Sequence, residues 1–249
     1  MGEVSGLLAI WYREFIVFTR EKSRVIASIV NPLLFLVIFG AGLGSSVSVQ
    51  DMSYQSFIFP GIIAMTLIFT SIFYGVYIIW DKMLDFLKEV LVAPLSRTTI
   101  FIGKVLGGVT DAMIQGSILL IIGILLGLKI SFTGIPTALL IMLISAIGLV
   151  GIGLIIGSLL ERPEGFQLIG TFLNFPLFLL SGALFPIDNL PAWLIPFTYA
   201  NPVTYTVDAL RISLLGTGQF NILVDIAVLL IFASITTVVG TISFRRMKM

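Results

Sequence analysis

The sequence predicts an all-α membrane protein with six transmembrane helices, an N-terminal interfacial helix and a broken, re-entrant helical segment before the last span. Composition is the first reason, because 58% of the 249 residues are hydrophobic and 11% are charged, whereas soluble domains carry about 25% charged residues. The second reason is a set of six apolar runs, each near the roughly 20 residues that cross a bilayer. These runs cover residues 25–44, 57–80, 105–128, 135–160, 166–185 and 222–244. We therefore predict that residues 1–249 form a single transmembrane domain.

The positions of Lys and Arg predict the orientation. All 14 of these residues except Lys129 and Arg211 lie on one side of the six predicted spans. Loops rich in Lys and Arg stay in the cytoplasm, so this side is predicted to be cytoplasmic and to hold both termini. An even number of spans requires the same arrangement. We expect a multi-pass protein of the cell (inner or cytoplasmic) membrane.

Composition also excludes several classes of function. The net charge of +1 gives no basis for a nucleic-acid partner. The chain has no cysteine and no histidine, which removes thiolate nucleophiles, the commonest metal ligand and the commonest general base. Gly103-Lys104 is followed by Val105 rather than by Ser or Thr, so there is no phosphate-binding loop. An aspartyl pair of Asp111 and Asp225 is disfavoured because these residues are expected in opposite halves of the membrane. We expect no catalytic residue, metal or cofactor in this chain.

Residues 1–24 are predicted to form the interfacial helix. Leu7, Trp11, Phe15 and Phe18 recur at helical spacing and form one apolar stripe, while the arginines of this segment lie elsewhere around the helix. The apolar run is too short for a signal peptide. Such a helix is expected to lie along the cytoplasmic surface before the first span.

The longest cytoplasmic segment, residues 81–104, contains a second amphipathic pattern. Apolar residues from Met83 to Leu91 keep helical spacing against charged ones, and Pro94 ends the pattern. The spacing predicts a short helix within residues 81–95. It leaves two roles open, a helix that faces a cytosolic partner and a helix that lies on lipid headgroups.

Residues 186–216 are predicted to lie on the outer side as a re-entrant pair of short helices. Four prolines interrupt this apolar segment. Asn201 and Pro202 form a good N-cap and first-turn pair, and Gly216 suits the C-terminal end, so a helix from Pro202 to Leu215 is expected. The alternative is an interfacial loop anchored by aromatic side chains.

Glycines four residues apart recur within the predicted spans, which permits close helix crossings. The pairs are 40/44, 103/107, 123/127 and 153/157. With glycine so frequent, they support a closely packed bundle and do not locate a dimer face.

Polar residues inside the apolar runs are candidates for a transport path or gate, because a membrane-buried carboxylate usually faces a partner or a wet cavity. Asp111 and Gln115 share one helix face, and a structural hydrogen-bond cluster is the alternative reading for them. Asp208 and Arg211 are spaced to pair with each other on the outer helix. The full candidate set is Asp111, Gln115, Asn174, Asn201, Asp208 and Arg211.

The order of these segments resembles the membrane subunits of type-2 ABC exporters, which include drug-resistance, nodulation-factor and polysaccharide-export permeases. Residues 88–97, KEVLVAPLSR, loosely match the family's Glu-x-Leu-x-x-Pro pattern through Glu89, Leu91 and Pro94. Residues 201–211, NPVTYTVDALR, match its Asn-Pro helix through Asn201 and Pro202. The likeness covers nearly the whole chain.

The resemblance implies a half-transporter that pairs with a second copy of itself, or with a paralogous permease, and binds a separate cytoplasmic ABC ATPase that holds ATP and Mg²⁺. The helix in 81–95 would be the coupling helix, and the turn at 161–164 a second, smaller contact. The implied ATPase-contact residues are Asp85, Leu87, Lys88, Glu89, Leu91, Glu161 and Arg162. The expected substrate is amphiphilic, such as a drug, a lipid or a lipid-linked glycan. The alternative function is a secondary transporter or channel driven by an ion gradient.

Overall fold

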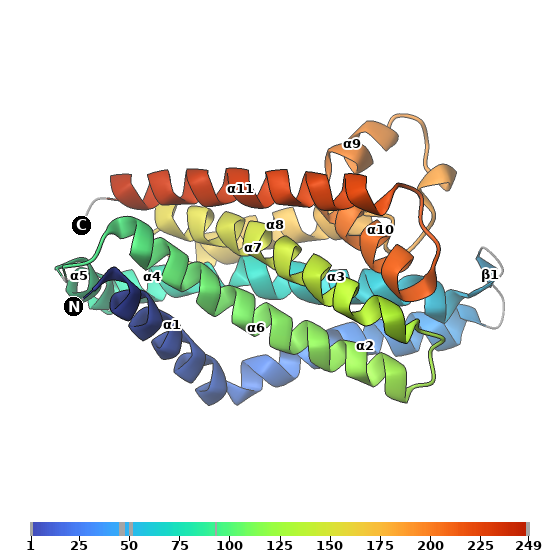
Figure 1. Cartoon of the computed structure of the whole chain (residues 1–249), viewed down its shortest axis with the longest axis horizontal. Helices are drawn as coiled ribbons and strands as arrows, with labels where there is room; N and C mark the ends of the chain where they lie inside the picture. The colour runs from blue at the N-terminus through green and yellow to red at the C-terminus, as the bar shows by residue number, and fades with distance from the viewer. Residues whose placement is uncertain (1, 45–47, 50–51, 93, 248–249) are drawn as a thin grey trace.

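Long helices run side by side along one axis of the molecule (Figure 1). The computed structural model describes residues 2–44, 48–49, 52–92 and 94–247. The helices are α1 (Glu3–Arg20), α2 (Lys22–Gly44), α3 (Tyr54–Phe73), α4 (Val76–Met83), α5 (Phe86–Val92), α6 (Arg97–Leu125), α7 (Ile135–Leu159), α8 (Pro163–Leu179), α9 (Ile195–Ala200), α10 (Pro202–Leu215) and α11 (Ile222–Arg246). Short 3-10 turns lie at Phe132–Gly134 and Ile187–Asn189, and β1 (Ser48–Val49) pairs antiparallel with β2 (Met52–Ser53). Both termini and α5 lie at one end of the bundle, opposite β1.

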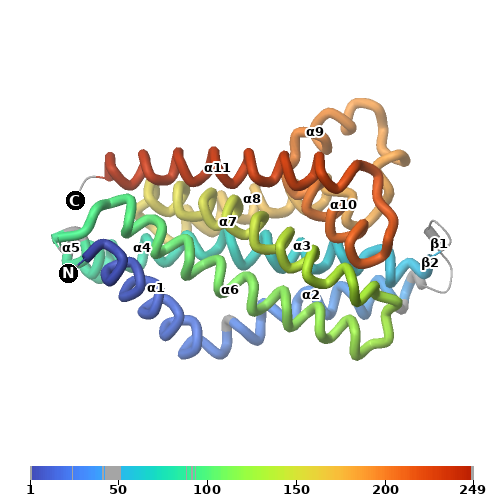
Figure 2. The backbone as a smooth tube through the Cα atoms, viewed as in Figure 1, coloured from blue at the N-terminus to red at the C-terminus, as the bar shows by residue number. Residues whose placement is uncertain are grey.

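The helix lengths agree with an all-α membrane protein. Within the described residues, four helical stretches are long and apolar enough to cross a bilayer: Tyr54–Met83, Arg97–Leu125, Phe132–Leu159 and Ile222–Arg246. A fifth is obtained when α1 and α2, which meet at a bend of 66°, are counted as one span. Figure 2 shows this bend in the backbone trace. Each of the six predicted apolar runs overlaps a helix, and the run at 166–185 overlaps α8, which has 17 residues and is not among these long apolar stretches.

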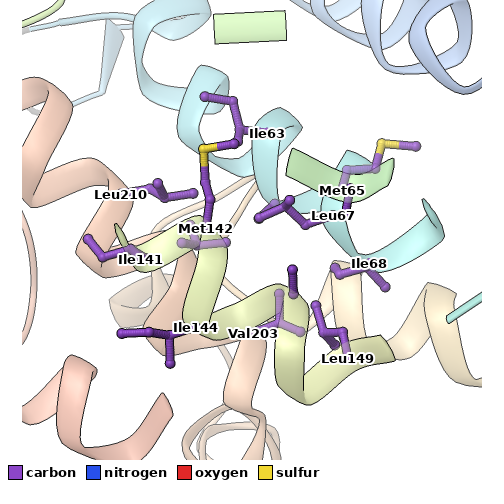
Figure 3. Close-up of a cluster of buried hydrophobic side chains, with 14 of the residues drawn as sticks. Ile63, Met65, Leu67, Ile68, Ile141, Met142, Ile144, Leu149, Val203 and Leu210 are labelled. Atoms are coloured by element: carbon purple, nitrogen blue, oxygen red, sulfur yellow. The ribbon is translucent and has the colours of Figure 1, made fainter. Parts of the chain in front are cut away.

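The hydrophobic core lies where α3, α7 and α10 meet (Figure 3). Apolar side chains point inward from all three helices, and they include Ile63, Leu67, Met142, Leu149 and Leu210. α11 then packs along α7, and α1 packs obliquely along α6. The side chains of α3 are almost entirely buried, so α3 is the central helix of the molecule.

Glycines allow the α3–α4 segment to touch α7 backbone to backbone. A Cβ added to Gly75, at the break between α3 and α4, would lie 1.9 Å from the carbonyl oxygen of Gly153. A Cβ on Gly157 would lie 2.2 Å from the carbonyl oxygen of Gly75. The predicted close crossing at the 153/157 pair is therefore confirmed. No residue with a side chain fits these positions without moving the helices apart.

Charged side chains cap the ends of helices that are distant from them in the sequence. The Lys82 ammonium of α4 donates to three carbonyl oxygens at the end of α7, those of Gly157 (3.0 Å), Ser158 (2.6 Å) and Leu160 (3.0 Å). Arg97 of α6 donates to the carbonyl oxygens of Phe244 (3.2 Å) and Met247 (2.9 Å) at the end of α11. Cations at a helix C-terminus satisfy free carbonyl groups and complement the helix dipole.

The N-terminus of α6 is closed by a carboxylate. Glu3 of α1 accepts a hydrogen bond from the backbone N–H of Ser96 at 3.0 Å and another from the Thr99 hydroxyl. The hydrogen bond from Thr99 is the main reason that the pKa of the Glu3 carboxyl lies below its ordinary value. Glu3 therefore remains charged where it complements the helix dipole.

The structure changes two expectations at this end of the molecule. The helix predicted within 81–95 is divided, because the chain turns at Asp85 with a φ of 57° and α5 begins only at Phe86. Lys104, counted with the cytoplasmic loop, lies inside α6 and is 1% exposed. In α1, the apolar stripe faces its own chain, since Trp11 donates to Thr110 of α6 at 3.0 Å.

The helix predicted from Pro202 to Leu215 is confirmed. α10 begins at Pro202 and ends at Leu215, and the Asn201 side chain accepts from the Val203 N–H at 3.0 Å. Gly216 closes the helix with a φ of 75°, which glycine adopts without strain.

Candidate functional site

Four charged side chains meet in the interior near the end that holds both termini. Lys104 of α6 donates to Glu14 of α1 at 2.6 Å and also to Asp81 of α4. Arg13 of α1 bonds the same two acids, at 2.7 Å to Glu14 and 2.8 Å to Asp81. We call Arg13, Glu14, Asp81 and Lys104 the charge cluster. It holds two positive and two negative groups and joins three helices.

Burial makes the charge cluster sensitive to the loss of any member. Glu14, Asp81 and Lys104 are almost inaccessible to solvent, and the Tyr74 hydroxyl donates to Glu14 at 2.8 Å. A buried charge is tolerated when its partners and hydrogen bonds are complete. This cluster was not predicted from the sequence. Its one local signal is the N-cap residue Ser96, whose hydroxyl oxygen accepts a hydrogen bond from the backbone N–H of Thr99. A helix that begins after Ser96 includes Lys104.

The short helix α5 contacts the charge cluster through its first residue. The Arg13 guanidinium lies 4.1 Å from the centre of the Phe86 ring, a cation–π contact. Leu87 is 4% exposed and is buried by the chain itself, so it offers little surface to a partner. Glu89 and Val92 face outward, and Val92 is 80% exposed. The side chains of Lys88 and Leu91 lie outside the described residues.

The second predicted contact segment lies beside the end of α4. Glu161 and Arg162 are exposed in the turn between α7 and α8. They line a groove of about 540 Å³, with walls formed by Trp80, Met83, Glu161, Arg162, Pro163, Glu164 and Gln167. Of the segment 81–95, which the resemblance assigns to a partner, Met83 lines this groove, and α5 begins three residues later. Asp85 lies exposed in the turn between α4 and α5.

Asp111 and Gln115 are both buried in α6, as their shared helix face predicts. The Thr70 hydroxyl of α3 donates to the Gln115 side-chain oxygen at 2.6 Å. Gln115 and Thr70 also line a cavity of about 720 Å³. Asp111 does not line this cavity.

The other polar candidates lie near α10. Asp208 accepts from the backbone N–H groups of Gln219 at 2.8 Å and Phe220 at 2.9 Å. Arg211 donates to the Gly182 carbonyl oxygen at 3.0 Å and stacks on the Phe57 ring. The expected direct Asp208–Arg211 pair is therefore not formed, because each side chain binds a loop instead.

Asn201 and Asn174 have different surroundings. The Asn201 amide donates to the Leu177 carbonyl oxygen of α8 at 2.7 Å, which attaches the outer helix to that element. Asn174 is buried in α8, and neither polar atom of its side chain has a hydrogen-bond partner among the described residues. The structure thus separates the predicted path residues into a group on α6 and a group around α8 and α10.

We expect Asn201→Ala to destabilise the protein by about 1–2 kcal/mol, because it removes an N-cap and also leaves the partly buried Leu177 carbonyl without its donor. Thermal unfolding of the purified variant, followed by size-exclusion chromatography of the heated protein, measures this change. Asn221→Ala, which removes the exposed N-cap of α11 alone, is the matched control and should have a smaller effect. An equal effect of the two variants would contradict the Leu177 contribution.

The family model described as the ABC-2 type transporter matches residues 5–215 of the chain. The chain belongs to the ABC-2 type transporter family. This membership agrees with an all-α membrane permease and identifies the charge cluster, α5 and the outer helix as parts of an ABC-2 permease.

Relatives of this ABC-2 permease have names that refer to transport or nodulation. It is 30% identical over 215 residues, 84% of this chain and 73% of the relative, to the putative transport permease ycf38 of Cyanophora paradoxa. It is 26% identical over 246 residues to nodulation protein J of Rhizobium leguminosarum bv. viciae, covering 97% and 95% of the two chains. It is 26% identical over 235 residues to the inner membrane transport permease YadH of Escherichia coli K12, covering 91% and 90%.

Proposed function

We propose that this ABC-2 permease is the transmembrane subunit of an ATP-driven exporter. Two copies form the substrate path, and each binds a separate cytoplasmic ATPase that holds ATP and Mg²⁺. The six spans are α2, the α3–α4 pair, α6, α7, α8 and α11. Both termini and α5 lie on the cytoplasmic side of the cell membrane, in keeping with the distribution of Lys and Arg.

One observation carries the proposal: Met83 from segment 81–95 and Glu161 and Arg162 from the second predicted contact line one groove, at the end of the bundle that holds both termini. Apolar side chains are exposed at this end, including Met83 and Val92, and the acidic side chains of Glu89, Glu161 and Glu164 are exposed as well. Protein interfaces combine such apolar and polar groups.

The contacts of α5 give a route for transmitting movement. When the ATPases close on ATP, a displacement of α5 would act on Arg13 through the Phe86 ring. Arg13 is bonded to Glu14 and Asp81, and both acids are bonded to Lys104 of α6. A tilt of α1, α4 and α6 together would open an outward path between the two copies, with residues 186–216 acting as the gate. An amphiphilic substrate suits a path bounded by apolar helices.

The sharpest test replaces one exposed apolar residue of α5. Val92→Asp adds a charge where the ATPase would pack, and we expect at least a tenfold loss of the ATP-hydrolysing protein that co-purifies with the tagged chain in mild detergent. Phe132→Asp is the matched control, because Phe132 is 69% exposed at the opposite end of the bundle. This control should retain the partner in a one-to-one ratio.

Two results would overturn the proposal. If the unmodified chain purifies from its native cells without an ATP-hydrolysing protein even after chemical cross-linking, the exporter function is wrong. If Val92→Asp and Phe132→Asp retain equal amounts of the partner, the contact through α5 is wrong.

A further inference from the structure

A cavity of about 720 Å³ lies between the α1–α2 bend and the α3–α4 segment, and one residue of α6 closes its far end. Aromatic side chains form much of its wall, among them Phe69, Phe73, Tyr77 and Trp80. The cavity reaches the surface beside Ala27 and Trp80, which are both exposed. A volume of this size falls within the roughly 300–1,000 Å³ of sites for drug-sized ligands.

The residue that closes the cavity has an unused hydrogen-bond donor. Gln115 is fully buried, and its side-chain oxygen is occupied by the Thr70 hydroxyl. Its Nε2 group has no hydrogen-bond partner among the described residues. A buried amide nitrogen without an acceptor is unfavourable. A ligand in the cavity that carries an acceptor oxygen would satisfy this group.

The charged groups of the cavity already bind protein partners. Arg13 and Asp81 are paired with each other at 2.8 Å, and Glu21 accepts from the Tyr77 hydroxyl. None of these contacts involves Gln115. Gln115 lies eleven residues after Lys104 on α6, which is about 16 Å along the helix axis at 1.5 Å per residue. The apolar wall between the charge cluster and Gln115 therefore spans the length of a drug-sized molecule.

We propose that this cavity binds an uncharged, largely aromatic lipophile, with a carbonyl or ether oxygen of the ligand accepting a hydrogen bond from Gln115 Nε2. The aromatic wall favours a flat apolar body, and the single buried donor selects an acceptor. The proposed binding depends on the cavity alone. The role of the ligand as a transport substrate rests on the proposed exporter function.

The test uses the full chain in lipid nanodiscs, without an ATPase or ATP, so that failure of binding and failure of export are distinguishable. Benzophenone, an uncharged diaryl ketone, is cross-linked by light, and the labelled peptides are identified by mass spectrometry. We expect labels on the peptides that contain Phe73, Tyr77 and Trp80. Fluorenone and fluorene, which share a flat body and differ by one carbonyl group, then compete for the site.

Fluorenone should compete at an about fivefold lower concentration than fluorene, as expected for one neutral hydrogen bond. In Gln115→Leu this preference should disappear, while Gln167→Leu, the same change on an exposed residue of α8, should keep it. The partitioning of each analogue into lipid does not depend on the protein variant. Comparing the variants therefore removes the contribution of partitioning to the measured preference. Ala27→Phe, which narrows the mouth of the cavity without removing a polar group, should reduce the labelling.

Labelling outside the cavity lining would overturn the proposal. An unchanged preference for fluorenone in a folded Gln115→Leu variant would also overturn it. Equal competition by the two analogues in the unmodified chain would indicate that the cavity accepts any apolar body, such as a lipid tail, and would overturn the role of Gln115. If Gln115→Leu fails to fold, Ala27→Phe still decides whether the label occupies the cavity.

Discussion

Replacing Lys104 with methionine is expected to destabilise the protein by about 3–5 kcal/mol, the effect of removing one partner from a buried ion pair. Methionine keeps the length of the side chain and removes its charge. Glu14 and Asp81 would then share the single cation Arg13, so the charge cluster would carry one uncompensated negative charge in the interior. The expected fall in melting temperature is roughly 6–20 °C for a chain of this size.

The control for this variant is Lys129→Met, the same change on an exposed residue, which should leave the melting temperature nearly unchanged. Lys104→Met combined with Asp81→Asn restores neutrality to the cluster, and we expect it to recover part of the lost stability. Size-exclusion chromatography of heated samples measures all three variants. A Lys104→Met protein as stable as Lys129→Met would show that the cluster contributes nothing to the fold.

Gly75→Ala is expected to have the second large effect, a loss of about 3 kcal/mol or more. The added Cβ would lie 1.9 Å from the Gly153 carbonyl oxygen, whereas ordinary contact begins near 3.4 Å. The obstacle is backbone on both sides, so α4 and α7 must separate. That separation would also pull Lys82 away from the carbonyl groups that it caps at the end of α7.

Gly165→Ala is the matched control, because a Cβ at Gly165 in α8 meets nothing within 4 Å. Alanine is favoured over glycine within a helix, so this control should be neutral or slightly stabilising. Comparison of the two melting temperatures separates the close crossing from the general effect of removing a glycine. Equal melting temperatures would contradict the backbone contact between Gly75 and Gly153.

The sequence was sufficient to locate the helices because the signals for their positions are local. Each long apolar run overlaps a helix, and the bounds of α10 follow from Asn201, Pro202 and Gly216, which act on neighbouring residues. The contact at Gly153 and Gly157 was also predictable as a close approach. The identity of its partner was not, since Gly75 is a lone glycine with no spacing pattern.

The charge cluster could not be predicted because its bonds join distant residues. Lys104 lies 90 residues from Glu14 and 23 from Asp81, and each of these side chains is an ordinary loop or interfacial charge by local pattern. The division of the 81–95 helix was also hidden. Helical spacing of apolar residues continues across Asp85, and only the positive φ of that residue interrupts the helix.

The partners of α1 bear on the order of events during synthesis of the chain. Domains form from the N-terminus onward as the ribosome elongates the polypeptide, so α1 is made before the residues of α6 that its carboxylates bind. Glu3 meets Ser96 only 93 residues later, and Glu14 meets Lys104 only 90 residues later. Until α6 has been inserted, Glu3 lacks these donors and Glu14 lacks its ion pair with Lys104. The first helix to be synthesised is therefore among the last to reach its final place.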